Sequence, residues 1–154
     1  MTQLELFETA ADVADILPRR NDVRKGDAAE AYVRAKLLNW DFCAHDALRD
    51  LPYDVVVDLG GTVCRIQVKC RSHAVNGRWY FRAMRGNWRS ATGTYAYAPG
   101  DYDVAAFVAL SLEKVLFLPG VLSQVTFRTE DFRRENAECR SWIEALHVFT
   151  DVAA

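Results

Sequence analysis

The chain has 154 residues, which is long enough for one compact domain with its own core and too short for two full domains. Hydrophobic residues make up 51% and charged residues 26% of the sequence, so an intrinsically disordered chain is excluded. The formal net charge of −2 gives no overall attraction to a polyanion. We expect one globular domain over residues 1–154, with an N-terminal arm or helix (1–20), a core (22–110) and a C-terminal hairpin and helix (111–154).

No apolar run approaches the roughly 20 residues that a membrane-spanning helix needs, and the N-terminus lacks the pattern of a signal peptide. We therefore expect a cytoplasmic protein that makes no membrane contact. The four cysteines form no C-x-x-C pair, and the three histidines do not fall at metal-ligand spacing beside them. Free, buried thiols in a reducing compartment are the expected state of these cysteines.

The charges are distributed unevenly along the chain. From Leu59 to Gly100 there is no acidic residue, although this stretch holds seven basic residues, which leaves 12 basic and 21 acidic residues for the rest. The segregation predicts one cationic face, as phosphate binding requires, and the alternative is a chance asymmetry on a solvated hairpin. The seven basic residues are Arg65, Lys69, Arg71, Arg78, Arg82, Arg85 and Arg89.

Two helices are predicted before the first strand. Residues 4–17 carry apolar side chains at helical spacing up to Pro18, which indicates a short helix or arm that packs on the core or on a second subunit. Residues 22–40 contain many good helix formers, with Asn21 or Asp22 as the cap.

Three strands are predicted next. Residues 53–59 and 62–70 form an antiparallel hairpin around Gly60-Gly61, because glycine allows the backbone angles of a tight turn. The dipeptide Asn76-Gly77 predicts a second turn, and a third strand follows over residues 78–84.

The later part of the chain begins with residues 85–102, which are predicted to form a long loop that is functional or mobile. Residues 103–110 are nearly all apolar, which is typical of a strand buried on both faces at the centre of a sheet. Residues 115–118 form its short hairpin partner. A helix starts at residues 129–131, where acidic side chains suit the first turn, and runs to about Leu146.

Strand alternation brings polar side chains together on one face of the first hairpin. In its second strand Arg65, Gln67, Lys69 and Arg71 share a face, and the residues between them face the core. Asp54, near the start of the partner strand, lies near the amide and the ammonium across the hairpin. Together they suit a cation site with an ammonium beside it.

Glu30 is a carboxylate on an otherwise inward-facing stripe of the second helix, which it shares with Gly26, Val33 and Leu37. A buried acid needs a partner or a metal, because desolvating it unpaired costs several kcal/mol. The alternative to a metal is an ion pair with Arg34 or another arginine.

In chain order, Glu30 on a helix, Pro52-Tyr53-Asp54 at a strand and Gln67-Val68-Lys69 on the next strand resemble the PD-(D/E)XK nuclease superfamily of restriction endonucleases and Holliday-junction resolvases. The resemblance covers residues 22–110. It implies an α/β fold with a restriction-endonuclease-like α-β-β-β-α-β core, in which a mixed central sheet is flanked by helices and residues 103–110 form a core strand.

The sequence departs from the family pattern at Gln67, where the motif usually has Asp or Glu. Intron-encoded homing endonucleases of the superfamily are similar in carrying Gln-x-Lys, with a helix start like Lys25-Gly26. An amide oxygen can bind Mg²⁺ but brings no negative charge, so the number of metal ions stays open.

The resemblance implies four catalytic residues for metal-dependent phosphodiester hydrolysis. Asp54 would be the principal metal ligand, Gln67 and the carbonyl of Val68 would complete the inner shell, and Glu30 would bind the metal directly or through water. Lys69 would orient the attacking water and offset charge in the transition state. The implied cofactor is Mg²⁺, which Mn²⁺ could replace.

The segment from Leu59 to Gly100, which has no acidic residue, adds a predicted DNA-binding surface. Arginines there could contact phosphates or guanine, and the neighbouring aromatic side chains could stack on splayed bases. For Trp79 and Phe81 a place in the core, alternating with Tyr80 and Arg82 outside, is the better interpretation. The predicted DNA-binding residues are Arg65, Arg71, Arg78, Arg82, Arg85 and Arg89.

The expected function is therefore a Mg²⁺-dependent endonuclease, homing- or restriction-like, acting on duplex or branched DNA. It would work as a homo-oligomer, dimer or tetramer, because one active site cuts one strand. Two alternatives stay open. One is a Holliday-junction resolvase of the same fold, and the other is a DNA-binding or interaction protein that has lost activity, for which Gln67 is the hint.

Overall fold

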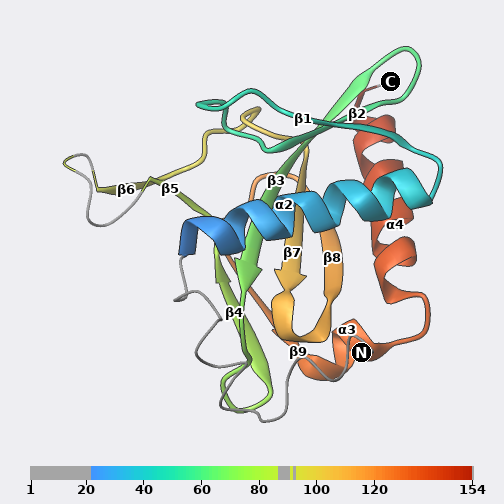
Figure 1. Ribbon diagram of the computed structural model, residues 1–154. Helices are drawn as coiled ribbons and strands as arrows, with labels where there is room; N and C mark the ends of the chain where they lie inside the picture. The colour runs from blue at the N-terminus through green and yellow to red at the C-terminus, as the bar shows by residue number, and fades with distance from the viewer. Residues whose placement is uncertain (1–21, 87–90, 92, 154) are drawn as a thin grey trace, which may run out of the picture.

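The computed structural model describes residues 22–86, 91 and 93–153 (Figure 1). The helix predicted over residues 4–17, and Arg89 among the predicted DNA-binding residues, lie outside this part. The helices and strands in chain order are α2 (Asp22–Asn39), β1 (Cys43–Asp46), β2 (Val55–Asp58), β3 (Val63–Arg71), β4 (Arg78–Arg82), β5 (Met84–Gly86), β6 (Thr94–Ala96), β7 (Val104–Ala109), η2 (Leu110–Leu112), β8 (Lys114–Pro119), β9 (Gln124–Arg128), α3 (Thr129–Arg133) and α4 (Ala137–Ala153).

Five strands form the central sheet in the order β1-β2-β3-β7-β8. Neighbouring strands are antiparallel except β3 and β7, which run parallel with Ile66 opposite Val104. Every residue of β7 is buried, because both faces of an interior strand are covered, and this explains its nearly continuous apolar sequence. The predicted α/β fold with a mixed central sheet flanked by helices is confirmed.

The sheet separates two hydrophobic cores. On one face α2 and α4 pack over the strands, with Leu37 and Trp142 in the same cluster as Ile66; Figure 1 shows α2 crossing the strands and α4 beside it. On the opposite face β4, β9 and α3 cover the sheet, and Phe81 packs on Phe107 of β7 with ring centroids 5.1 Å apart. The polar side chains of β3 therefore lie on this second face of the sheet, at the edge of the layer formed by β4, β9 and α3.

Two strand pairings differ from the sequence prediction. The strand predicted over residues 78–84 is β4, and it pairs with β9 in a separate two-stranded ribbon, here called the β4–β9 ribbon, instead of extending the hairpin of the central sheet. The third antiparallel strand of the sheet is β1, which pairs with β2 and lies in a segment for which the sequence predicts no strand. Only Ala44 of its four residues is buried, so this edge strand lacks the apolar alternation by which strands are identified.

The prediction of one continuous helix from residues 129–131 to Leu146 is wrong, because the structure has two helices in this segment. Helix α3 ends at Arg133 and α4 begins at Ala137. Between them Asn136 has a φ of 56°, a left-handed conformation that a continuous helix does not contain. The break lets α3 pack on the ribbon side of the sheet while α4 packs on the opposite face.

The connection from β3 to β7 runs through β4, β5 and β6, and its described part contains no helix. The predicted loop over residues 85–102 includes most of the small β5–β6 hairpin, which projects away from the central sheet (Figure 1). No helix in the described part of the chain is long and apolar enough to cross a membrane.

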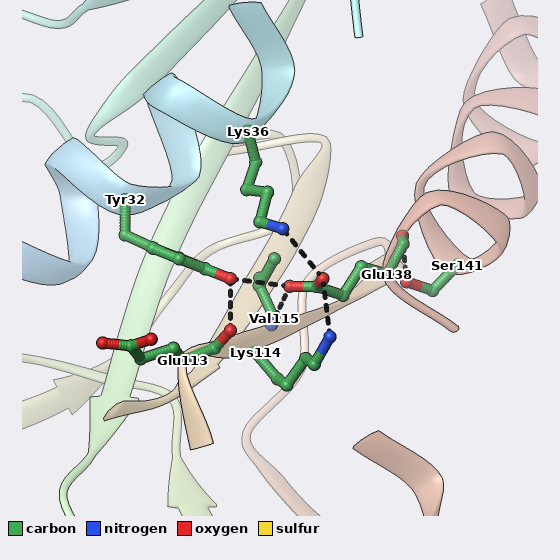
Figure 2. A network of polar contacts seen from close by, with 7 residues as sticks. All are labelled: Tyr32, Lys36, Glu113, Lys114, Val115, Glu138 and Ser141. Carbon is green, nitrogen blue, oxygen red and sulfur yellow. Dashed lines mark hydrogen bonds and ion pairs between the residues drawn. The ribbon is translucent and has the colours of Figure 1, made fainter. Parts of the chain in front are cut away.

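A buried carboxylate fastens α2 to α4 and β8. Glu138 of α4 accepts hydrogen bonds from Lys36 at 3.1 Å and from the N–H of Val115 at 2.9 Å (Figure 2). The hydroxyl of Tyr32 lies 2.9 Å from the same carboxylate. Because Tyr32 is two residues from Glu30, this network also fixes the part of α2 that carries the predicted catalytic acid.

Candidate active site

Asp54 lies at the point where the connection from β1 meets β2. Its carbonyl accepts a hydrogen bond from the N–H of Ala47 at 2.9 Å, and its own N–H donates to the carbonyl of Ile66 at 2.8 Å. The first bond continues the β1–β2 pairing by one residue beyond Val55, and the second continues the β2–β3 pairing in the same way. Asp54 consequently faces Gln67, as strand alternation predicts.

The Asp54 carboxylate, the Gln67 amide and the backbone of Val68 form one hydrogen-bonded cluster. Nε2 of Gln67 donates to Oδ2 of Asp54 at 2.7 Å and to the carbonyl of Val68 at 3.1 Å. The N–H of Val68 donates to the same Oδ2 at 2.8 Å. Gln67 is only 5% exposed, so the sheet and the layer above it hold its amide in place between two oxygen atoms.

Burial raises the pKa of Asp54 above its usual value, and two neighbours oppose this effect. The hydrogen bond from the N–H of Val68 and the positive charge of Lys69 both favour the ionised carboxylate. A desolvated carboxylate can bind a divalent cation strongly, because the attraction between opposite charges is larger where water is excluded.

Lys69 is held by two acceptors that the sequence analysis missed. Its ammonium donates to the carbonyl of Met84 at 3.0 Å and to the hydroxyl of Tyr97 at 3.1 Å, and it lies 5.2 Å from the centroid of the Tyr97 ring. Burial lowers the pKa of Lys69, whereas the charges of Asp54 and Glu30 raise it. The ammonium is therefore fixed in direction and interacts with both predicted acids.

Glu30 approaches this cluster from α2. It lines a pocket of about 420 Å³ together with Asp54, at the start of β2 and under the β1–β2 connection. Burial, followed by the charges of Asp54, Asp27 and Asp46, raises the pKa of Glu30 to about 7, with Arg49 acting in the opposite direction. The alternative ion pair with Arg34 is not formed, since that guanidinium binds Asp46 at 2.7 Å.

The donor set of this site fits a hard divalent cation. It offers the carboxylates of Glu30 and Asp54, the carbonyl of Val68 and the side-chain amide of Gln67, all oxygen-bearing groups that Mg²⁺ or Mn²⁺ accepts. Among the described residues no group of three or more His, Cys, Asp and Glu side chains forms a metal site, so two carboxylates and neutral oxygens have to suffice. Mg²⁺ binds in this way, because it keeps several water ligands. For Gln67 to bind the metal, its amide has to turn over and present Oε1.

The predicted DNA-binding arginines occupy different environments. Arg65 forms a two-pronged ion pair with Asp103 of 2.9 and 3.0 Å, so its guanidinium is already used inside the protein. Arg71 donates to the carbonyl of Tyr80 at 2.8 Å, and Arg85 donates to that of Asp50 at 2.9 Å. The remaining described pair, Arg78 and Arg82, is exposed on β4.

The aromatic residues of β4 divide as alternation predicts. Trp79 and Phe81 are 2% and 1% exposed and belong to the core, which confirms the structural interpretation of both. Tyr80 between them is exposed, and it points away from the core with Arg78 and Arg82.

Solved structures that are similar to the chain include a homing endonuclease and a Holliday junction resolvase. A bacterial homing endonuclease, I-Ssp6803I, superposes with a TM-score of 0.64 at 23% identity, covering 87% of this chain and 97% of the endonuclease, which shows a shared fold. A Holliday junction resolvase from Archaeoglobus fulgidus gives a TM-score of 0.42 at 16% identity, covering 71% of this chain and 88% of the resolvase. No curated protein matches the sequence.

A family model described as PD-(D/E)XK endonuclease matches residues 20–148, which is most of the chain. The matched part includes every residue of the candidate site described above. The chain thus belongs to the PD-(D/E)XK endonuclease family.

Proposed function

We propose that the protein is a metal-dependent endonuclease that hydrolyses phosphodiester bonds in DNA, in the manner of homing or restriction enzymes. One observation carries the proposal: a desolvated carboxylate, Asp54, lies in hydrogen-bond contact with Gln67 and within the electrostatic reach of the fixed ammonium of Lys69. Together with membership of the family, this arrangement supports nuclease chemistry better than a purely structural role for these buried polar groups.

In the proposed reaction Asp54, Gln67 and the carbonyl of Val68 would hold Mg²⁺, with Glu30 binding it directly or through water. The bound cation would lower the pKa of a water molecule and neutralise charge on the phosphate. Lys69 would orient the attacking water through its Nζ and stabilise the negative charge that develops on the phosphate oxygens. The contacts of Lys69 with Met84 and Tyr97 support this role, because they fix the ammonium before the substrate arrives.

We further propose that residues 1–154 work as one nuclease domain in a homo-oligomer. Cutting both strands of a duplex means hydrolysing one phosphodiester bond in each strand, which requires two active sites. A symmetric dimer, or a tetramer built from such dimers, would supply them. The basic residues exposed on β4 would contribute to binding the duplex.

The test is cleavage of plasmid, linear duplex and four-way junction DNA by the purified protein, with Mg²⁺, with Mn²⁺ and with EDTA. We expect cleavage that depends on the metal and is lost in Asp54→Asn, while DNA binding is retained. Asp58→Asn is the matched control, because Asp58 is exposed and its carboxylate accepts a hydrogen bond from the N–H of Gly60 in the turn at 2.8 Å. Exclusive cleavage of junctions would identify a resolvase. Binding without cleavage of any substrate would favour an inactive DNA-binding protein.

A further inference from the structure

The β4–β9 ribbon presents a second face whose composition differs sharply from its buried face. Burial alternates along both strands, so that Trp79, Phe81 and Phe127 point into the core and every second residue points to solvent. The exposed residues are Arg78, Tyr80 and Arg82 of β4 and Gln124, Thr126 and Arg128 of β9. None of the six is acidic, and all carry groups that can donate hydrogen bonds.

The register pairs these side chains across the two strands. Arg78 stands opposite Arg128, and Arg82 stands opposite Gln124. Two like charges directly opposite each other destabilise a ribbon in the absence of a counter-ion. The opposed pair of Arg78 and Arg128 lowers the stability of the free protein in this way, which is consistent with binding to a polyanionic partner.

Hydrogen bonds from β3 also fix the position of the β4–β9 ribbon relative to the candidate active site. The Arg71 side chain of β3 donates to the carbonyl of Tyr80 within β4, and Lys69 donates to the carbonyl of Met84, two residues beyond the end of β4. The N–H of Ala83 continues the ribbon by donating to the carbonyl of Ser123 at 2.9 Å. The end of the ribbon with Arg82 therefore lies next to the site, and the end with Arg78 lies about 14 Å further along the strand, given about 3.4 Å per residue.

We propose that the exposed face of the β4–β9 ribbon enters the major groove of duplex DNA and determines which base pairs beside the cut are recognised. This inference rests on the proposed function and names the specificity-determining residues for it. The major groove of B-form DNA admits a two-stranded antiparallel ribbon, whereas the narrower minor groove admits one only when the duplex is deformed. The side-chain types match base edges: arginine pairs with guanine, glutamine with adenine, and the methyl group of threonine contacts that of thymine.

The spacing of the exposed residues makes the proposal specific. Residues on one face of a strand repeat every 6.8 Å or so, which is about the rise of two base pairs of B-form DNA. The three cross-strand pairs would then contact alternate positions within a stretch of about four to five base pairs, beginning at the end marked by Arg82 and Gln124.

The experiment is selection of preferred sequences from a pool of randomised duplexes by the full chain in EDTA, which leaves binding readable whether or not the protein cleaves. We expect the parent to enrich a motif with preferred bases at alternate positions. Gln124→Ala should lose the preference at one position, with about tenfold weaker affinity for the motif and unchanged affinity for bulk DNA. Arg128→Gln should relax the preference at its own position, weaken binding to every sequence through the lost positive charge, and raise Tm, because the opposed charge is removed.

Arg140→Gln is the matched control, since Arg140 is an exposed arginine of α4 and is not part of the ribbon. The proposal is overturned if the ribbon variants select the parent motif with parent affinity, or if the parent binds RNA or single strands in preference to duplex. If the ribbon variants bind like the parent but the parent still cleaves DNA in a metal-dependent way, the proposed function stands and only the role of the ribbon is overturned. If the parent selects a motif that depends on the ribbon but cleaves no DNA, only the proposed function is overturned.

Discussion

Gln67 donates a hydrogen bond of 2.7 Å to the carboxylate of Asp54, so the neutral residue of the motif is bound directly to its principal acid. In Gln67→Glu the two side chains would both be carboxylates at this distance, and like charges this close cannot both ionise without cost. We expect the metal-free variant to be less stable than the parent by about 2 kcal/mol at pH 8.

Mg²⁺ should reverse that loss, because a second carboxylate adds charge to the metal site. The measurement is Tm against Mg²⁺ concentration, with Gln124→Glu as the control that adds the same charge on the exposed ribbon. An equal Mg²⁺ response of Tm in the two variants would place the cation elsewhere.

Tyr97→Phe removes the hydroxyl that accepts a hydrogen bond from Lys69 but keeps the ring beside the ammonium. With one acceptor fewer, the ammonium is oriented less well, and we expect kcat to fall about tenfold while KM for DNA changes little. The reference variant is Tyr95→Phe, because Tyr95 is exposed on β6 and its ring, not its hydroxyl, lies near Arg85. A change in KM alone would mean that Tyr97 contributes to substrate binding and not to the position of Lys69.

Strand alternation predicted the central part of the site, since Asp54, Gln67 and Lys69 depend only on the local β2–β3 hairpin. Met84 and Tyr97 could not be predicted in this way. They meet Lys69 because the chain leaves β3, forms the β4–β9 ribbon and the β5–β6 hairpin, and then returns as β7. Contacts that depend on distant pairing leave no periodic signal in the sequence.

Arg65 illustrates the same limit. Its place on the β3 face with Gln67 was predicted, but the parallel pairing of β3 with β7 brings Asp103 to its guanidinium. The pairing of β4 with β9 was likewise not predicted, because β9 follows β4 only after β5, β6, β7 and β8 and no local turn joins the two strands.

Glu138→Gln tests the network that fastens α2. The buried carboxylate is shared by Lys36 and Lys114, and its replacement leaves both ammonium groups without an anionic partner in this network (Figure 2). We expect a loss of about 2 kcal/mol in the free energy of unfolding, less than for a fully buried pair because both lysines are partly exposed. Urea denaturation measures it, and Glu144→Gln, an exposed acid on the same helix, should leave the stability unchanged. Equal stability of the two variants would contradict an anchoring role.

The raised pKa of Glu30 predicts how stability depends on pH in the absence of metal. The folded protein holds this proton with a pKa of about 7, against an ordinary value of 4.5, so the folded state binds the proton more strongly than the unfolded state does. The contribution of Glu30 to stability is therefore lost as pH rises from about 4.5 to about 7 and is constant above that range. Glu30→Gln cannot ionise, and in EDTA its free energy of unfolding should equal the parent's at the acidic end and exceed it at pH 8. Because Glu30 is partly exposed, water screens part of the effect. Urea denaturation from pH 4 to pH 8 provides the measurement, with Glu144→Gln as the exposed reference. Saturating Mg²⁺ at pH 8 should reverse the order, since a cation makes the ionised carboxylate favourable, and a variant that keeps its advantage in Mg²⁺ would exclude Glu30 from the metal site.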